Sequence, residues 1–153
     1  MGVAIREARR EDFDAVFTLL GQLRDQFKEE KRADKAGVLA IYERYLESDD
    51  HQVYVAEMDG RLVAVMSTSI LQSLYGHCPY LIVDELVVDA GHRGRGTGKR
   101  LLDEAFSLAR DRGCCEVCLD TTSDNERAIR FYRAYGFDRE SILFEKELKD
   151  GEG

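Results

Sequence analysis

The segment from Tyr80 to Arg100 reads YLIVDELVVDAGHRGRGTGKR and decides the fold. Its first part, Leu81 to Val88, is an apolar run of strand length, which predicts a largely buried strand. A glycine-rich turn follows at once, and beyond it apolar residues recur at helical spacing. These residues are Leu101, Leu102, Ala105, Phe106 and Ala109. The segment therefore predicts a buried strand, a tight turn and an amphipathic helix in direct succession.

The glycine-rich turn has the character of an anion site. Between Gly91 and Arg100 it holds four basic residues and no acidic one, in a chain whose net charge is −8. Glycine lets a ligand approach the backbone closely, and the unpaired N–H groups of the following helix favour negative charge. The expected ligand is a diphosphate. The alternative is a tight strand-to-helix turn whose basic residues only decorate the surface.

Two other phosphate-binding loops fit the spacing less well. A P-loop needs Ser or Thr after Gly-Lys, whereas Arg100 follows Gly98 and Lys99. The dinucleotide fingerprint needs G-x-G-x-x-G, whereas Gly94, Gly96 and Gly98 are spaced G-x-G-x-G. Only 55 residues follow Gly98, too few for a second mononucleotide-binding half. A nucleotide-binding protein that uses this loop is therefore the weaker hypothesis.

Upstream of this segment, the pattern predicts two helices between a first strand and a hairpin. The residues from Val3 to Ala8 alternate apolar and polar, as a short strand does. Apolar residues at helical spacing run from Phe13 to Phe27 and again from Val38 to Leu46. Two β-rich runs between Val53 and Leu71 flank Asp59-Gly60, a strong hairpin signal. Strands two and three are thus predicted to be antiparallel neighbours.

Downstream, the pattern predicts three further elements. They are a fifth strand from Val117 to Thr121, a helix from Ala128 to Tyr135 and a final strand from Ile142 to Leu148. Because a crossover helix with short linkers joins strands four and five, these two strands are expected to be parallel.

Length and composition favour a single domain over residues 1–153. The 153 residues are 44% hydrophobic and 34% charged, which suffices for a core and a soluble surface. The net charge of −8 argues against nucleic acid or an anionic membrane as a partner. No apolar run reaches membrane-spanning length and residues 1–10 lack a secretory pattern, so a cytoplasmic location is expected.

The cysteines predict neither a disulfide framework nor a zinc site. Cys114, Cys115 and Cys118 fall within five positions, too close together to join distant parts of a fold. Strand alternation places Cys115 and Cys118 on opposite faces, and no second pair completes four zinc ligands. With Cys78 in a separate loop, all four are expected to be small buried residues, and no metal is predicted.

Two blocks of the sequence resemble the motifs of a known family. Arg93-x-x-Gly96-x-Gly98, directly after Leu86-Val87-Val88-Asp89, resembles the acyl-CoA-binding motif of the GNAT superfamily of N-acetyltransferases. Asn125-x-x-Ala128-x-x-Phe131-Tyr132-x-x-Tyr135-Gly136-Phe137 resembles that family's downstream motif. The resemblance covers essentially the whole chain. Within the family, Glu85-Leu86-Val87-Val88 and the general layout are most similar to small-amine acetyltransferases of the aminoalkylphosphonate type.

This resemblance implies an α+β (mixed α/β) fold of the GNAT type. A central mixed sheet of six to seven strands would be flanked by about four helices, with strands four and five parallel and splayed. Acetyl-CoA would be the co-substrate, its pyrophosphate against the glycine turn and its pantetheine arm beside strand four. A backbone N–H near Val87 or Val88 would polarise the thioester carbonyl. The implied cofactor-binding residues are Leu86, Val87, Val88, Arg93, Gly94, Arg95, Gly96, Thr97, Gly98, Lys99 and Asn125.

The resemblance also implies direct acetyl transfer to a primary amine, catalysed by Tyr132 and Glu85. Tyr132 matches the family's tyrosine, the expected general acid for the departing thiolate; a structural tyrosine is the alternative. Glu85 is the expected base, working through water, and its alternative role is to bind a cationic substrate. Its neighbour Asp84 is expected to face the opposite side of the strand.

The sequence leaves the acceptor open. Its pocket is expected at the first two helices and the loop from Gln72 to Tyr80, with Asp84, Tyr75 and His77 as candidate substrate contacts. Acidic residues such as Glu29 and Glu30 would favour polyamines or aminoglycosides. A peptide or protein amine, or a non-catalytic acyl-CoA-binding module, are the alternatives to a small molecule. Homodimers are common in this family.

Overall fold

The computed structural model describes residues 2–26 and 34–148, and the chain forms two compact units, residues 1–119 and 120–153. The charged stretch that contains Glu29 and Glu30 lies outside the described residues. No helix in the described ranges is both long and apolar enough to cross a membrane.

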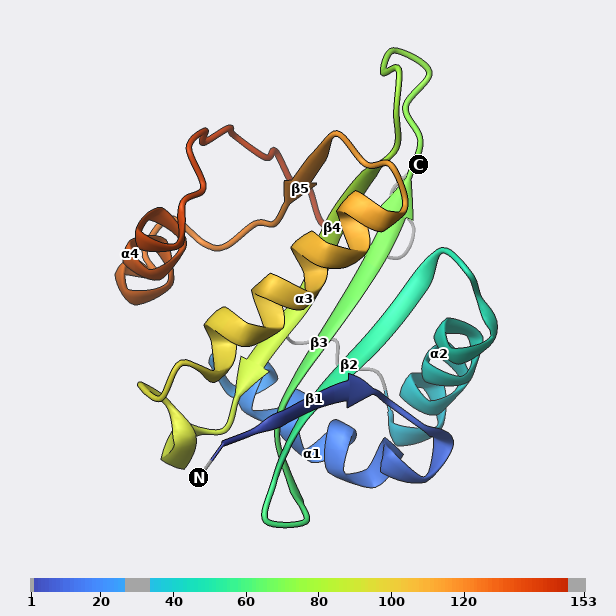
Figure 1. Cartoon of the computed structure of the whole chain (residues 1–153), viewed down its shortest axis with the longest axis vertical. Helices are drawn as coiled ribbons and strands as arrows, with labels where there is room; N and C mark the ends of the chain where they lie inside the picture. Colours follow the sequence, from blue (N-terminus) through green and yellow to red (C-terminus); the bar gives the residue numbers. More distant parts are fainter. Residues whose placement is uncertain (1, 27–33, 149–153) are drawn as a thin grey trace. The chain divides into compact units, whose positions relative to one another are not determined.

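The first unit is built on one mixed sheet of five strands in the order β1-β2-β3-β4-β5 (Figure 1). Its strands are β1 (Ala4–Glu7), β2 (His51–Met58), β3 (Arg61–Leu71), β4 (Tyr80–Val88) and β5 (Glu116–Cys118). The first four strands pair antiparallel, and β5 is parallel to β4, as expected. The expectation of six to seven strands was wrong: five form in the part of the chain that is described.

Two helices pack on one face of this sheet, and α1 (Phe13–Gln26) contributes most of the buried contacts there. Together with α2 (Lys35–Glu47) it covers Val55, Val65 and Val87, which come from three neighbouring strands. The odd-numbered residues of β2 and β3 face this layer because side chains alternate along a strand.

The other face of the sheet is covered by α3 (Thr97–Asp111), which crosses in front of the strands in Figure 1. Leu101, Leu102 and Ala105 of this helix are fully buried. Their spacing places them on one face of the helix, and this pattern is the one that predicts the helix from sequence. The same face of α3 packs against β3 and β4.

The hairpin between β2 and β3 turns where the sequence predicts. Asp59 and Gly60 have φ values of 52° and 77°, so both central residues adopt the left-handed conformation of the turns that suit a twisted hairpin. Glycine has no Cβ to resist that conformation, and aspartate tolerates it better than most residues.

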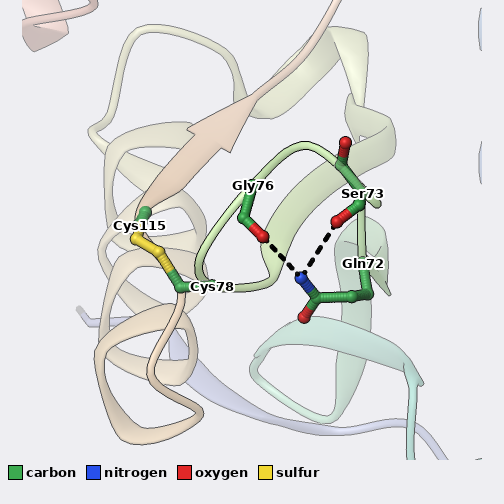
Figure 2. The surroundings of a disulfide bond; sticks show 5 residues. All are labelled: Gln72, Ser73, Gly76, Cys78 and Cys115. Carbon is green, nitrogen blue, oxygen red and sulfur yellow. Dashed lines mark hydrogen bonds between the residues drawn. A yellow bond between two sulfur atoms is a disulfide. The ribbon is translucent and has the colours of Figure 1, made fainter.

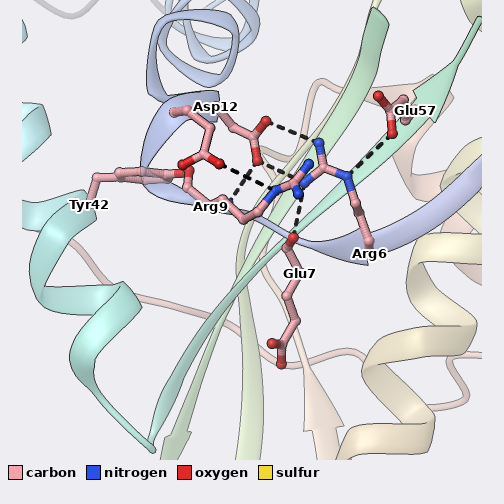
Figure 3. Close-up of polar contacts among 7 residues, drawn as sticks. Arg6, Glu7, Arg9, Asp12, Tyr42 and Glu57 are labelled. Atoms are coloured by element: carbon pink, nitrogen blue, oxygen red, sulfur yellow. Dashed lines mark hydrogen bonds and ion pairs between the residues drawn. The ribbon is translucent and has the colours of Figure 1, made fainter. Parts of the chain in front are cut away.

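A polar cluster fixes the start of α1 against β1 (Figure 3). The guanidinium of Arg6 donates to both oxygens of Asp12 at 2.8 and 3.0 Å and to Glu57 at 3.3 Å. This pairing lowers the pKa of the Asp12 carboxyl. The Tyr42 hydroxyl donates to the backbone oxygen of Arg9 at 2.5 Å, and burial raises the pKa of that hydroxyl to about 12. The cluster thereby ties β1, the turn before α1 and α2 together.

A disulfide joins two segments of the first unit that the sequence analysis had kept apart (Figure 2). Cys78, in the loop before β4, is bonded to Cys115, directly before β5, across 37 positions of sequence. Their Cα atoms are 5.8 Å apart, a distance typical of disulfides. The expectation that all four cysteines are isolated buried residues was wrong, because spacing along the chain does not show that the β4–β5 pairing brings these two together.

The second unit contains one helix, α4 (Glu126–Tyr135). The side-chain oxygen of Asn125 caps it by accepting from the N–H of Ala128 at 3.2 Å, and Gly136, with φ of 123°, ends it. The final strand predicted from Ile142 to Leu148 does not form. Its residues have strand propensity, but a strand is stable only when a neighbour takes its backbone hydrogen bonds.

Candidate active site

The glycine turn presents an open backbone at the start of α3. Gly94 and Gly96 have φ values of 78° and 81°, and a Cβ at either position would meet nothing within 4 Å. Gly96 is the N-cap residue and has no side chain, so no cap bonds the N–H groups of the first turn. These groups, which include those of Gly98 and Lys99, are suited to an anionic ligand.

The basic residues of the turn do not act as one cluster. Arg93 folds back, and its Nε donates to the backbone oxygen of Val88 at 3.3 Å. Lys99 pairs with Asp103 at 3.4 Å on the exposed side of α3, and Arg100 donates to the backbone oxygen of Val3. Arg95 is exposed. Arg93 thus helps to shape the turn, and charge alone does not identify the side chains that would meet a phosphate.

The position of the turn is fixed from α1 by the side chain of Gln22. Its Nε2 donates to Asp89 at 2.7 Å, and its Oε1 accepts from the N–H of Ala90 at 3.1 Å. The Nδ1 atom of His92 lies 2.8 Å from the same Asp89 carboxyl. The hydrogen bonds from Gln22 and His92 lower the pKa of that carboxyl. The amide therefore links the helix on one face of the sheet to the loop that leads to the other face.

One edge of β4 is largely free of strand pairing. β4 pairs with β5 only through Tyr80, Leu81 and Ile82. In the sheet of the described residues, no strand lies beside positions 83–88 on that edge. A strand edge without a neighbour can bond an extended ligand. That Leu86, Val87 and Val88 bind the cofactor there stays a prediction.

A β-bulge places Asp84 and Glu85 on the same face of the sheet. Glu85 is opposite Ser67 and Val83 is opposite Thr68, so Asp84 is an extra residue in β4. The Ser67 hydroxyl donates to Glu85, and the Ser69 hydroxyl donates to Asp84 at 2.5 Å. Ser67 and Ser69 are two residues apart in β3 and share a face. The expectation that the two acids point to opposite faces was therefore wrong, because simple alternation fails at a bulge.

Asp84 belongs to a network that spans three strands and a helix. Its Oδ2 atom also accepts from the hydroxyl of Tyr45, in α2, at 3.3 Å. The Nδ1 atom of His51, in β2, lies 2.9 Å from the Ser69 hydroxyl, and the rings of Tyr45 and His51 have centroids 4.3 Å apart. Asp84 itself is exposed, whereas Glu85 is half-buried.

The two carboxyl groups have different electrostatic environments. Burial raises the pKa of Glu85, the negative charge of Asp84 raises it further, and the hydrogen bond from Ser67 acts in the opposite direction. Burial also raises the pKa of the Tyr45 hydroxyl. A carboxyl group with a raised pKa can take up a proton closer to neutral pH, which is the property of a general base.

The loop residues predicted to contact the substrate lie apart from this network. Tyr75 is almost fully exposed and His77 is exposed, both in the loop between β3 and β4. No hydrogen bond between the described residues joins either of them to the two acids. In the second unit, Tyr132 lies in α4 between the rings of Phe131 and Phe137, with centroid distances of 5.4 and 5.8 Å. Burial, and to a smaller extent the charge of Asp120, raise the pKa of its hydroxyl.

The sequence analysis missed four residues of the network. They are Tyr45, His51, Ser67 and Ser69. One signal was available: the two serines stand, with Thr68 between them, in a largely apolar strand, and a buried hydroxyl needs a partner. The pairing of Ser69 with Asp84 depends on the bulge, for which the sequence gives no sign.

Comparison with known proteins finds a family that matches most of the chain. Residues 4–137 match the model of the acetyltransferase (GNAT) family. Streptothricin acetyltransferase of Streptomyces lavendulae is 36% identical over 75 residues, which are 47% of this chain and 40% of that protein. The chain spans about half the length, or less, of the curated relatives it matches first.

Two solved structures share the fold over nearly the whole chain. Glucosamine-6-phosphate N-acetyltransferase from Arabidopsis thaliana is 25% identical, with a TM-score of 0.80 and coverage of 97% of this chain and all of that one. An aminoglycoside N-acetyltransferase in complex with CoA is 23% identical, with a TM-score of 0.82 and coverage of 95% and 94%.

Proposed function

Because the chain belongs to the acetyltransferase (GNAT) family, we propose that it transfers the acetyl group of acetyl-CoA directly to a primary amine of a small molecule. The observation that carries this proposal is that β4 has both a half-buried carboxyl group at a bulge and a strand edge that lacks a neighbour. The first supplies a base and the second supplies backbone groups for an extended cofactor. Both features lie within residues 4–137, which match the family model.

The cofactor would bind along β4 and the glycine turn. Its pantetheine arm would pair with backbone groups of Leu86 and Val88, and an N–H near Val87 would polarise the thioester carbonyl. The pyrophosphate would lie against the first turn of α3, where Gly94 and Gly96 leave the backbone open. Relatives of the family support this reading, since one neighbour with the same fold was solved with CoA.

The chemistry needs a neutral amine and a proton for the thiolate. In our proposal Glu85, through water, takes the proton from the acceptor ammonium, and the amine nitrogen attacks the thioester carbonyl. The developing oxyanion is held by the backbone N–H on β4, and the carbon–sulfur bond then breaks. Tyr132 gives its hydroxyl proton to the departing sulfur, and the second proton that the nitrogen loses as the amide forms passes through water to restore that hydroxyl. Its raised pKa means that it is protonated at neutral pH, as an acid must be.

The acceptor is proposed to be a small amine rather than a peptide. Similar proteins include a streptothricin, an aminoglycoside and a glucosamine-6-phosphate acetyltransferase, whose names denote small-molecule acceptors. Two carboxyl groups on one face of the sheet suit an acceptor that is a cation before it reacts. The aminoalkylphosphonate likeness, the homodimer and the cytoplasmic location stay predictions.

Two measurements test the proposal. Calorimetric titration with acetyl-CoA should show binding in the micromolar range, and a panel of primary amines should release free CoA thiol in the presence of the protein. Absence of binding at millimolar acetyl-CoA would refute the proposed activity. Binding without acetylation of any amine in a broad panel would favour a non-catalytic acyl-CoA-binding module instead.

A further inference from the structure

We propose that Asp84 is a positioning residue beside the base: the bulge turns its carboxylate onto the face of Glu85, where Ser69 and Tyr45 hold it next to that base. This inference rests on the proposed function, because it assigns Glu85 the role of base. It adds a residue that the sequence had placed on the opposite face.

The bulge is the first step of the argument. In a regular strand, consecutive side chains alternate, and only one of two neighbouring acids could face α2. Here Asp84 has no partner residue in β3, and both acids accept from serines that share a face. A bulge costs ladder hydrogen bonds and is commonly found where a strand re-aims a side chain. Its effect at this position is to bring a second negative charge beside Glu85.

The second step is that the Asp84 carboxylate is held rather than free to turn to solvent. One oxygen, Oδ2, accepts from Ser69 at 2.5 Å and from Tyr45 at 3.3 Å. A serine hydroxyl has one proton, and Ser69 gives it to Asp84. His51 must therefore donate from Nδ1 to Ser69 across 2.9 Å. The hydrogen bonds therefore run in one direction, from the imidazole of His51 through the Ser69 hydroxyl to the Asp84 carboxylate. The negatively charged group of this series lies beside Glu85.

The third step concerns the charge that Glu85 experiences. Burial is the largest cause that raises its pKa, the hydrogen bond from Ser67 lowers it, and the negative charge of Asp84 raises it. Tyr45 from α2 and His51 from β2 are the other titratable groups that face the pair from the described side chains. Tyr45 stays neutral at physiological pH because burial raises its pKa. Asp84 is therefore the formal negative charge of this network that acts on the base.

The test uses the intact protein and does not require a known acceptor. The side-chain carboxyl carbon of Glu85 is followed by ¹³C NMR as a function of pH, with the signal assigned through Glu85→Gln. Asp84→Asn is the main variant, because asparagine keeps an oxygen that can accept from Ser69 and Tyr45 while it removes the charge. Ser69→Ala is the second variant, which keeps the charge and removes its support.

The matched control is Glu43→Gln. This variant removes a carboxylate from α2, the helix that carries Tyr45. Glu43 lies outside the network and pairs with Arg10 at 3.0 Å.

We expect the titration midpoint of Glu85 to move to lower pH in Asp84→Asn, to move less in the same direction in Ser69→Ala, and to be unchanged in Glu43→Gln. Once an acceptor is found, the acid limb of the kcat/KM profile should move with the NMR midpoint, while the KM for acetyl-CoA stays the same. A purely structural role would lower activity at every pH without moving the limb.

An unchanged or higher midpoint in Asp84→Asn would overturn the inference whatever the enzyme does. A lower midpoint in a protein that binds acetyl-CoA but acetylates no amine would instead refute the proposed function, and with it the role of Glu85 as base. The two failures are therefore distinguishable.

Discussion

Glu85 is a half-buried carboxyl group whose pKa is raised. Since burial and Asp84 raise its pKa, it is protonated at low pH and ionised above that pKa, so activity should rise with pH through its titration. Glu85→Gln should lower kcat/KM by roughly 10² to 10⁴ near neutral pH and abolish that limb. A pH series of thiol release with wild type and variant checks both effects. Full activity with an unaltered profile in the variant would assign the base elsewhere.

Tyr132 is tested by the loss of a single oxygen. Tyr132→Phe keeps the ring that packs between Phe131 and Phe137, so the fold should be retained. Turnover should fall roughly 10²- to 10⁴-fold with little change in the Kd for acetyl-CoA, because only proton transfer to the thiolate is lost. Tyr135→Phe, one helical turn away on α4, is the control and should keep its turnover. Equal rates for the two variants would mean that another group protonates the sulfur.

At the scale of the element, Gly96 at the start of α3 is expected to contribute to stability and, separately, to acetyl-CoA affinity. Gly96→Val introduces a β-branched residue at φ of 81°, which costs roughly 1–2 kcal/mol of stability, and fills the space that a phosphate would occupy. Gly113→Val, at φ of 72° beyond the other end of α3, carries a similar strain away from the site. Both should lose stability in thermal unfolding, but only Gly96→Val should lose acetyl-CoA affinity in calorimetry. Similar affinities for both would place the pyrophosphate elsewhere.

The disulfide should stabilise the connection between the β3–β4 loop and β5. Closing 37 residues of sequence restricts the unfolded chain by up to about 4 kcal/mol, so Cys78→Ser should lower the Tm by roughly 8–15 °C. A thiol count should find two reactive cysteines in the unfolded protein and four after reduction, since Cys114 and Cys118 are not part of the disulfide. Cys114→Ser is the control. A Tm that reductant leaves unchanged would show that the bond adds nothing.

Helices and turns could be predicted where a local sequence pattern determines them. Strands and bulges could not be predicted where they depend on a neighbouring strand. The helix after the glycine turn follows from the spacing of Leu101, Leu102 and Ala105, and the hairpin follows from Asp59-Gly60. The segment around Phe144 has strand propensity, but a strand also needs a neighbour to bond with. The bulge at Asp84 depends on how β4 fits β3, so the same-face pair of acids could not be foreseen.

For the molecule as a whole, the family match across residues 4–137 supports one domain, although the chain forms two compact units. The glycine turn and β4 could be located from sequence motifs. The network around Ser69 could not, because it forms only when the strands of the sheet come together. A motif records what binds a shared cofactor. The hydrogen-bonded network instead combines residues of α2, β2, β3 and β4 that are far apart in the sequence.

The single-domain proposal leads to a prediction about unfolding. In the described part of the second unit, residues 120–148, one helix forms and large apolar side chains are exposed: Ile142 at 81%, Leu143 at 60%, Phe144 at 91% and Leu148 at 74%. A segment below roughly 40 residues with so little buried surface is not expected to fold alone. We therefore expect a peptide of residues 120–153 to show no cooperative transition by circular dichroism. The intact chain should unfold in one calorimetric transition whose van't Hoff and calorimetric enthalpies agree. Two resolved transitions, or a folded peptide, would mean that the second unit is a domain in its own right.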